Sequence, residues 1–216
     1  MKQKEFKSPF NALILDELSQ IGVSCWVAGG ALRDHLTNQP TTTDCDLFFT
    51  DFNNLQKTKK HLTKSGGKIV WESPNGLKIN YKGTTYDLSK FYYSNPSEMF
   101  DNFDFTISQF ATDGKILYYG DDSLKHLRKK KLVLANITNP IATFKRSLSH
   151  HSKGYVMENK EVLNLYKKCF GMSAVNRTST FPPKKKIVNK KKEKMEEVYY
   201  NANGNGNEKK DNLEYQ

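Results

Sequence analysis

The chain has 216 residues, of which 37% are hydrophobic and 26% are charged, and this balance excludes collagen-like, mucin-like and coiled-coil proteins. No window approaches the ~18 apolar residues that cross a bilayer, and no signal-peptide core follows the lysines of the first segment, so we expect a cytoplasmic protein without a membrane partner. The formal net charge is +11, a positive field that favours nucleic acids and nucleotides as partners.

Near the start of the chain, the sequence predicts a strand, a glycine turn and a helix in that order. After a helix that begins at Pro9 and stops at Gly22, an apolar run over residues 23–28 predicts a strand that ends at Gly29-Gly30. Side-chain patterns and turn signals then predict further elements along the chain. These are strands over 44–49, 68–72, 76–81, 84–89, 103–111 and 116–119, and helices over 31–36, 51–64 and 121–131. The predicted fold class is α+β, a mixed and mainly antiparallel sheet flanked by helices.

The composition changes twice along the chain. Residues 139–170 predict two helices after Asn139-Pro140, and residues 171–216 lose apolar content and gain lysine and asparagine. Such a segment buries too little surface to offset the entropy of ordering. We therefore expect a domain over 1–138, a short helical segment over 139–170 and a disordered basic tail over 171–216.

Three motifs in order carry the chemistry: Gly29-Gly30-Ala31-Leu32-Arg33-Asp34, Asp44-Cys45-Asp46, and Asp87. Two glycines where a strand meets a helix let backbone N–H groups approach a phosphate. An Asp-x-Asp pair on a strand directs both carboxylates to one face, which suits hard divalent cations. A third carboxylate on a neighbouring strand would complete a two-metal site for phosphoryl transfer.

This ordered set resembles the head domain of the class II tRNA nucleotidyltransferase and bacterial poly(A) polymerase family, within the DNA polymerase beta-like nucleotidyltransferase superfamily. The family pattern is Gly-Gly-x-Val-Arg-Asp, Asp-x-Asp, a later acidic residue, and Arg-Arg-Asp-Phe-Thr-Ile-Asn. The three motifs match the first three parts of this pattern, and Asp104-Phe105-Thr106-Ile107-Ser108 matches the end of the fourth part. The resemblance covers roughly residues 20–150, so residues 1–138 correspond to the head and 139–170 to the start of a helical neck.

The resemblance implies transfer of a nucleoside monophosphate from an NTP to an acceptor hydroxyl, with two Mg²⁺ ions and with pyrophosphate as the second product. Asp44, Asp46 and Asp87 would be the catalytic residues and the metal ligands. Five further residues would serve the nucleotide, with the glycines and the arginine on the triphosphate: Gly29, Gly30, Arg33, Asp34 and Asp104.

The sequence departs from the family pattern in two places. Asn102 and Phe103 replace the paired arginines before Asp104, which removes two expected cations. The Glu-Asp-x-x-Arg segment that selects CTP and ATP in the family is not found in residues 140–170. The sequence therefore does not predict ordered CCA addition, and a partner protein that supplies acceptor binding is one expectation.

Three functions remain open. The first is NMP transfer to an RNA 3′ end, favoured by the basic run that comprises Lys125, Arg128, Lys129, Lys130 and Lys131, which either tracks an RNA backbone or is a solvated helix face. The second is transfer to a protein or a small molecule. The third is a catalytically silent module that binds nucleotide or RNA, which the lost arginines favour and the three retained carboxylates oppose.

Overall fold

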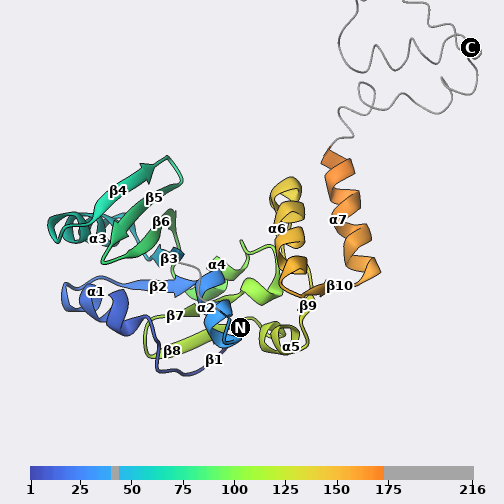
Figure 1. Cartoon of the computed structure of the whole chain (residues 1–216), viewed down its shortest axis with the longest axis horizontal. Helices are drawn as coiled ribbons and strands as arrows, with labels where there is room; N and C mark the ends of the chain where they lie inside the picture. The colour runs from blue at the N-terminus through green and yellow to red at the C-terminus, as the bar shows by residue number, and fades with distance from the viewer. Residues whose placement is uncertain (40–43, 173–216) are drawn as a thin grey trace, which may run out of the picture. The chain divides into compact units, whose positions relative to one another are not determined.

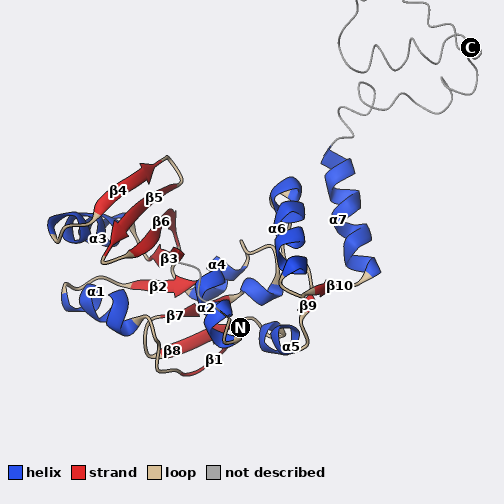
Figure 2. Ribbon diagram, in the orientation of Figure 1, coloured by secondary structure: helices blue, strands red, loops and turns tan. Residues whose placement is uncertain are grey.

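The computed structural model describes residues 1–39 and 44–172, and the chain divides into two compact units, Met1–Val162 and Leu163–Gln216. The strands are β1 (Lys2–Glu5), β2 (Cys25–Ala28), β3 (Asp44–Phe49), β4 (Lys68–Glu72), β5 (Gly76–Tyr81), β6 (Thr84–Tyr92), β7 (Phe110–Thr112), β8 (Ile116–Tyr119), β9 (Lys131–Leu132) and β10 (Val156–Met157). The helices are the π-helix η1 (Asn11–Leu15), the 3₁₀ helix η2 (Thr106–Ser108), and α1 (Asp16–Gln20), α2 (Gly30–Leu36), α3 (Phe52–Lys64), α4 (Pro96–Phe100), α5 (Ser123–Arg128), α6 (Pro140–Ser152) and α7 (Asn159–Met172). Figure 2 distinguishes the helices from the strands. In the part of the chain that the structure describes, no helix has the length and apolar character to cross a membrane.

An eight-stranded sheet with the order β1-β8-β7-β2-β3-β6-β5-β4 forms the centre of the first unit (Figure 1). The β3–β6 pair is parallel and all other neighbours in this sheet are antiparallel. The hairpin between β5 and β6 turns at Lys82 and Gly83, which both have positive φ, as a two-residue hairpin turn requires. The α+β class and the mixed, mainly antiparallel sheet predicted from the sequence are confirmed.

One face of the sheet carries the main hydrophobic core. On β3 the side chains of Cys45, Leu47 and Phe49 are buried there, because alternate residues of a strand point to the same side. Helices pack on this face through Leu18 of α1 and Leu55 of α3, each almost fully buried. Burial of this apolar surface is the main source of stability for the unit.

The opposite face carries a second, smaller core. Trp26 and Ala28 of β2, Ala111 of β7, and Met99 and Phe100 of α4 form it. The α4 helix begins at Pro96, and the Asn95 side chain caps it by accepting hydrogen bonds from the backbone N–H groups of residues 97 and 98. The three aromatic rings of Phe48, Tyr93 and Phe103 pack against this cluster and remain partly exposed.

The strand predicted over residues 103–111 is wrong for most of its length. Residues 106–108 form the 3₁₀ helix η2, and the strand β7 begins only at Phe110. The alternating apolar residues Phe105 and Ile107 are buried as a strand pattern suggests. However, the backbone of this stretch binds residues 133–136 instead of joining the sheet, with hydrogen bonds such as Ala135 N–H to the Asp104 carbonyl at 2.8 Å.

Residues 163–172, the described part of the second unit, are helical as the end of α7. Within them, the rings of Tyr166 and Phe170 lie 4.1 Å apart, centroid to centroid. The disordered tail expected over 171–216 lies almost entirely outside the described residues, and the boundaries at 138 and 170 remain predictions.

Candidate active site

The turn between β2 and α2 depends on Gly29. Its φ is +76°, in the region that favours glycine, and a Cβ placed on it would lie 3.3 Å from Asp46 Oδ2 and 3.8 Å from the Phe103 ring. The Gly29 N–H donates to the Phe110 carbonyl at 3.1 Å, which fixes the turn against β7. The glycine thus lets the backbone approach a carboxylate and an aromatic ring at once.

Three aspartates share the face of the sheet that carries the smaller core. Asp44 and Asp46 are two residues apart on β3, and Asp87 of β6 is the register partner of Asp46 in the parallel pair. The pKa of Asp46 is raised to about 6, first by burial and then by the negative charges of Asp87 and Asp44, while Lys78 and Arg33 oppose the shift. A nearby cation would therefore stabilise the charged form of the Asp46 carboxylate.

Lys78 of β5 supplies a cation to this cluster. Its Nζ lies 3.0 Å from Asp87 Oδ2 and 3.3 Å from Asp44 Oδ2, and these contacts raise the pKa of the lysine. The oxygen ligands of the three aspartates have the chemistry that Mg²⁺ prefers. Within residues 1–39 and 44–172, however, no group of three or more Asp, Glu, His or Cys side chains has an arrangement that would hold one metal ion.

Arg33 is held in place by Asp34. The Arg33 Nη2 atom lies 2.6 Å from Asp34 Oδ1, and the second carboxylate oxygen lies 3.1 Å from the Nζ of Lys153, at the end of α6. Arg33 is 5% exposed and Asp34 only 1%, so these charges are paired inside the protein. Asp34 therefore orients the Arg33 side chain without lining the pocket itself.

Asp104 forms an ion pair with an arginine of α6. The Arg146 Nη1 group donates a hydrogen bond to Asp104 Oδ2, where the family pattern would place arginines next to Asp104 in the chain. Close by, burial lowers the pKa of His150 to about 4, with Arg33 and Lys153 as further causes, so the ring is neutral at pH 7. Its Nδ1 atom is buried and finds no hydrogen-bond partner among the described residues.

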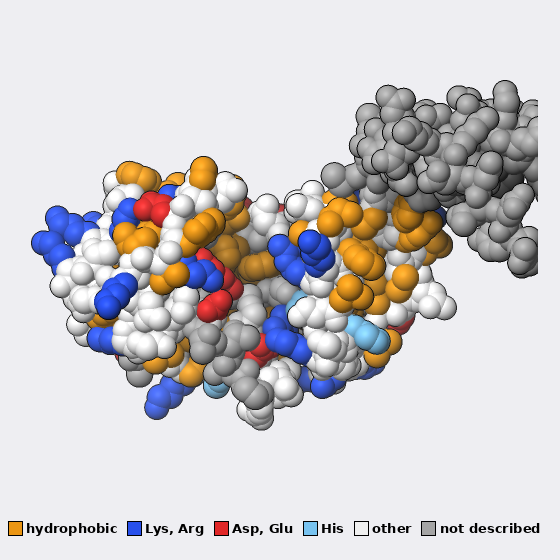
Figure 3. All heavy atoms as spheres, turned by 45° about the horizontal axis from the view of Figure 1, so that its top comes forward, with side chains coloured by type: hydrophobic (Ala, Val, Ile, Leu, Met, Phe, Trp, Pro, Cys, Tyr) orange, Lys and Arg blue, Asp and Glu red, His pale blue; other side chains and the backbone are white. Residues whose placement is uncertain are grey.

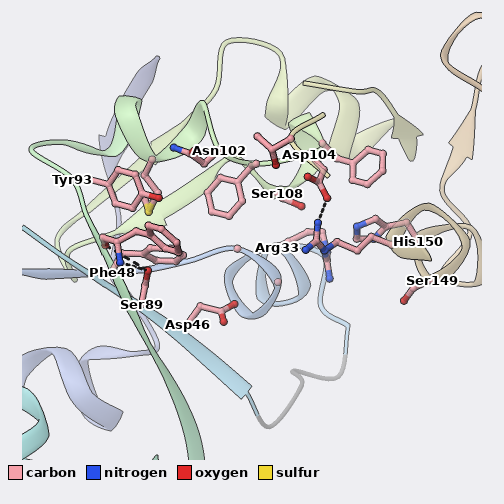
Figure 4. A pocket seen from close by; sticks show the side chains of 18 residues that line it. Arg33, Asp46, Phe48, Ser89, Tyr93, Asn102, Asp104, Ser108, Ser149 and His150 are labelled. Atoms are coloured by element: carbon pink, nitrogen blue, oxygen red, sulfur yellow. Dashed lines mark hydrogen bonds and ion pairs between the residues drawn. The ribbon is translucent and has the colours of Figure 1, made fainter. Parts of the chain in front are cut away.

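These residues border a pocket of about 640 Å³ (Figure 4). Five of the residues predicted for the site line it, namely Gly29, Gly30, Arg33, Asp46 and Asp104, whereas Asp34, Asp44 and Asp87 are not among the lining residues. In Figure 4, Phe48 and Tyr93 lie toward one side of the pocket, and Arg33 and His150 lie toward the other. The pocket therefore joins a charged end to an aromatic end.

A family model matches residues 1–130, and its description is Gabija anti-defense 2 family protein. The chain belongs to the Gabija anti-defense 2 family. A search of curated proteins gave no match. The family match spans the whole sheet, the glycine turn and the three aspartates, and it ends before α6.

Solved structures similar to this Gabija anti-defense 2 family member are CCA-adding enzymes. The Thermotoga maritima enzyme in complex with tRNA is 16% identical with a TM-score of 0.62, over 93% of this chain and 56% of that chain. The Bacillus stearothermophilus enzyme in complex with CTP is 18% identical with a TM-score of 0.52, over 71% and 42%. A further CCA-adding enzyme with CTP is 17% identical with a TM-score of 0.63, over 93% and 55%. The chain thus shares the nucleotidyltransferase fold and spans about half the length of these enzymes.

Several residues of the site were not predicted from the sequence. Lys78 occupies the alternate position of β5 that faces Asp87, so its place on the polar face follows once the strand pairing is known. Arg146 and His150 come from α6, and Phe48, Phe91, Tyr93 and Phe103 form the aromatic end. Chain order gives no signal for these, because they meet only through the tertiary fold.

The basic run lies away from the pocket. Lys125 pairs with Asp122 at 3.4 Å, Lys131 pairs with Glu158, and none of the five residues lines the pocket. Arg128 and Lys129 are exposed. On the face shown in Figure 3, lysine and arginine side chains are scattered and do not form one continuous stripe. A role of this run in RNA binding remains a prediction.

Proposed function

We propose that this protein transfers a nucleoside monophosphate from an NTP to an acceptor hydroxyl and releases pyrophosphate. The observation that carries the proposal is the register of the parallel β3–β6 pair, which sets Asp46 beside Asp87 on one face. Asp44 lies on the same face, and a Cβ added at Gly29 would lie 3.3 Å from Asp46 Oδ2. The nucleotidyltransferase fold of the similar structures supports the same reaction class.

In the proposed mechanism the triphosphate lies against Gly29, Gly30 and Arg33, with Asp34 holding the arginine in position. Asp104, tied to Arg146, orders the nucleotide side of the pocket. Asp44, Asp46 and Asp87 supply oxygen ligands of the kind that Mg²⁺ prefers, and they would hold two ions only after rearranging from the geometry described above, in which Lys78 contacts two of them. The ions would supply charge neutralisation for the transfer of the phosphoryl group. Asp87 would also accept the proton of the acceptor hydroxyl, and Lys78 would have to give up its contacts with Asp44 and Asp87 for these carboxylates to bind a cation.

An RNA 3′ end is the acceptor that the chain supports best. The net charge of +11 attracts a polyanion, and one of the similar enzymes is in complex with tRNA. The family description adds the biological setting, an anti-defense role against the Gabija system. That description also favours a second candidate, in which the acceptor is a hydroxyl of a Gabija protein.

Incubation of the protein with each labelled NTP, Mg²⁺ and either cellular RNA or Gabija proteins tests the proposal. We expect label in RNA from the native protein and none from the Asp44→Ala, Asp46→Ala double variant. Asp122→Ala removes an exposed carboxylate outside the pocket and is the matched control. Label in protein would establish the second candidate. No label in any fraction, with NTP still bound, would refute transfer and leave a silent nucleotide-binding module.

A further inference from the structure

The two ends of the pocket differ in chemistry. One end presents Arg33, Arg146 and the neutral His150, which suit phosphate and other polar groups. The other presents the rings of Phe48, Phe91, Tyr93 and Phe103. The proposed transfer reaction uses the charged end and the aspartates and gives no role to the rings.

Three of these rings, those of Phe48, Tyr93 and Phe103, belong to a connected aromatic cluster. The Phe48 centroid lies 6.0 Å from that of Phe103 and 6.1 Å from that of Tyr93, at interplanar angles of 76° and 58°. The first pair is edge to face and the second is tilted, and both distances lie in the range of favourable aromatic pairs. Phe91 is 55% exposed although it lines the pocket, so one ring can still bury a large apolar surface.

The aromatic end adjoins the proposed reacting centre. A Cβ on Gly29 would meet both Asp46 Oδ2 and the Phe103 ring within 4 Å, so carboxylate and ring flank the same point. A planar ring bound among the aromatic side chains would place an attached ribose beside Asp46. Phe103 stands where the family pattern has an arginine, so the exchange replaces a cation with a stacking surface.

We infer that the aromatic end of the pocket is a nucleobase-binding subsite, which holds one base of the reaction by stacking. This inference rests on the proposed function. Stacking on protein aromatic rings contributes ~1–3 kcal/mol per base and tolerates any base, because every base has a π face. The base belongs either to the incoming NTP or to the terminal nucleotide of the acceptor.

Two fluorescent probes distinguish these sources. One is a non-hydrolysable 2-aminopurine nucleoside triphosphate, and the other is a short RNA with 2-aminopurine at its 3′ end. Stacking quenches the fluorescence of this base. We expect quenching of one probe or both with the full chain and Mg²⁺, and the quenched probe identifies the source of the base.

Variants assign the quenching to the subsite. Phe103→Leu and Tyr93→Leu should each weaken binding of the quenched probe by about tenfold, whereas Phe103→Tyr keeps the ring face and should retain binding. Phe52→Leu alters an exposed ring outside the pocket and should have no effect. Thermal unfolding of each variant shows whether the fold is intact.

The inference is overturned if neither probe is quenched while Mg²⁺-pyrophosphate still binds by calorimetry, or if both leucine variants quench like the native protein. Neither result touches the transfer reaction, which is scored separately by label incorporation. Conversely, quenching that depends on Phe103 without any incorporation supports the subsite and refutes the transfer.

Discussion

The two faces of β3 show how one strand serves two purposes. Cys45, Leu47 and Phe49 point into the main core, while Asp44, Asp46 and Phe48 point to the face with the pocket. Because side chains alternate between the two faces of a strand, successive residues of β3 belong in turn to the core and to the pocket face. Substitutions on the two faces should differ in kind as well as in size, and four experiments can break or sharpen that comparison.

The largest effect is expected at Asp46. Asp46→Asn removes one carboxylate from the proposed metal ligands and keeps the side-chain shape, so label incorporation should fall about 100- to 1,000-fold. The fold should survive, because the change relieves repulsion with Asp44 and Asp87. Initial rates and circular dichroism measure both effects, with Asp122→Asn as the control. Incorporation at the native rate would exclude Asp46 from the reaction.

The neighbouring position should affect stability instead. Leu47 is fully buried in the main core, and Leu47→Ala should lower the free energy of unfolding by about 2–5 kcal/mol through lost burial and a residual cavity. Ser89→Ala on the pocket face should change it by less than about 0.5 kcal/mol. Urea denaturation compares the two, and equal effects would contradict the division between the faces.

The pH dependence of stability should reveal how much the charged carboxylate of Asp46 lowers the free energy of unfolding. Its pKa is about 6 in the folded protein against an ordinary value of 3.8, so the folded state binds the proton more tightly. Stability without metal should therefore fall as pH rises from about 4 to 6, by about 1–3 kcal/mol from this group. Asp46→Asn should be more stable than the native protein at pH 7 and lose that advantage near pH 4. Thermal unfolding from pH 4 to 8 checks this, and parallel curves for the two proteins would disprove it.

The smallest effect is expected at Lys78. Lys78→Met removes the cation between Asp44 and Asp87, so divalent ions should bind more tightly by up to about fivefold. Lys59→Met breaks an ion pair with Glu72 outside the pocket and is the matched control. Titration with Mn²⁺ followed by electron paramagnetic resonance measures the affinity. Weaker binding in Lys78→Met would mean that the lysine organises the carboxylates and does not compete for them.

Side-chain patterns and turn residues made several strands of the sheet predictable. The bounds of β3, β4 and β5 agree with the sequence prediction, because turn residues flank each run. Apolar residues alternate in β5, whereas β4 is a short continuous apolar run whose residues are all exposed. The same logic failed for residues 103–111, where the alternating residues are buried against residues 133–136 rather than in a strand ladder. The pattern reports burial of every second side chain and does not identify the backbone partner.

The pocket-lining residues that the sequence predicted are those that stand in a short motif. Gly29, Arg33 and Asp46 follow one another within two elements and could be read as a motif. The family pattern has arginines just before Asp104 that this sequence lacks, and Arg146 of α6 pairs with Asp104 instead. Lys78 and the aromatic end likewise depend on strand register and on α4, and a single sequence specifies neither directly.

The parallel pairing of β3 with β6 also has a consequence for how the protein folds. Asp46 and Asp87 are about forty residues apart in the chain and become neighbours only when β6 docks onto β3, after α3, β4 and β5. Closing so long a loop has an entropic cost that local hairpins such as β5–β6 avoid. A hairpin of β5 and β6 can therefore form early and bring Lys78 beside Asp87 before Asp44 and Asp46 arrive. In this order of folding, the ammonium group of Lys78 already neutralises Asp87 when Asp44 and Asp46 come close, which limits the repulsion between the carboxylates during folding.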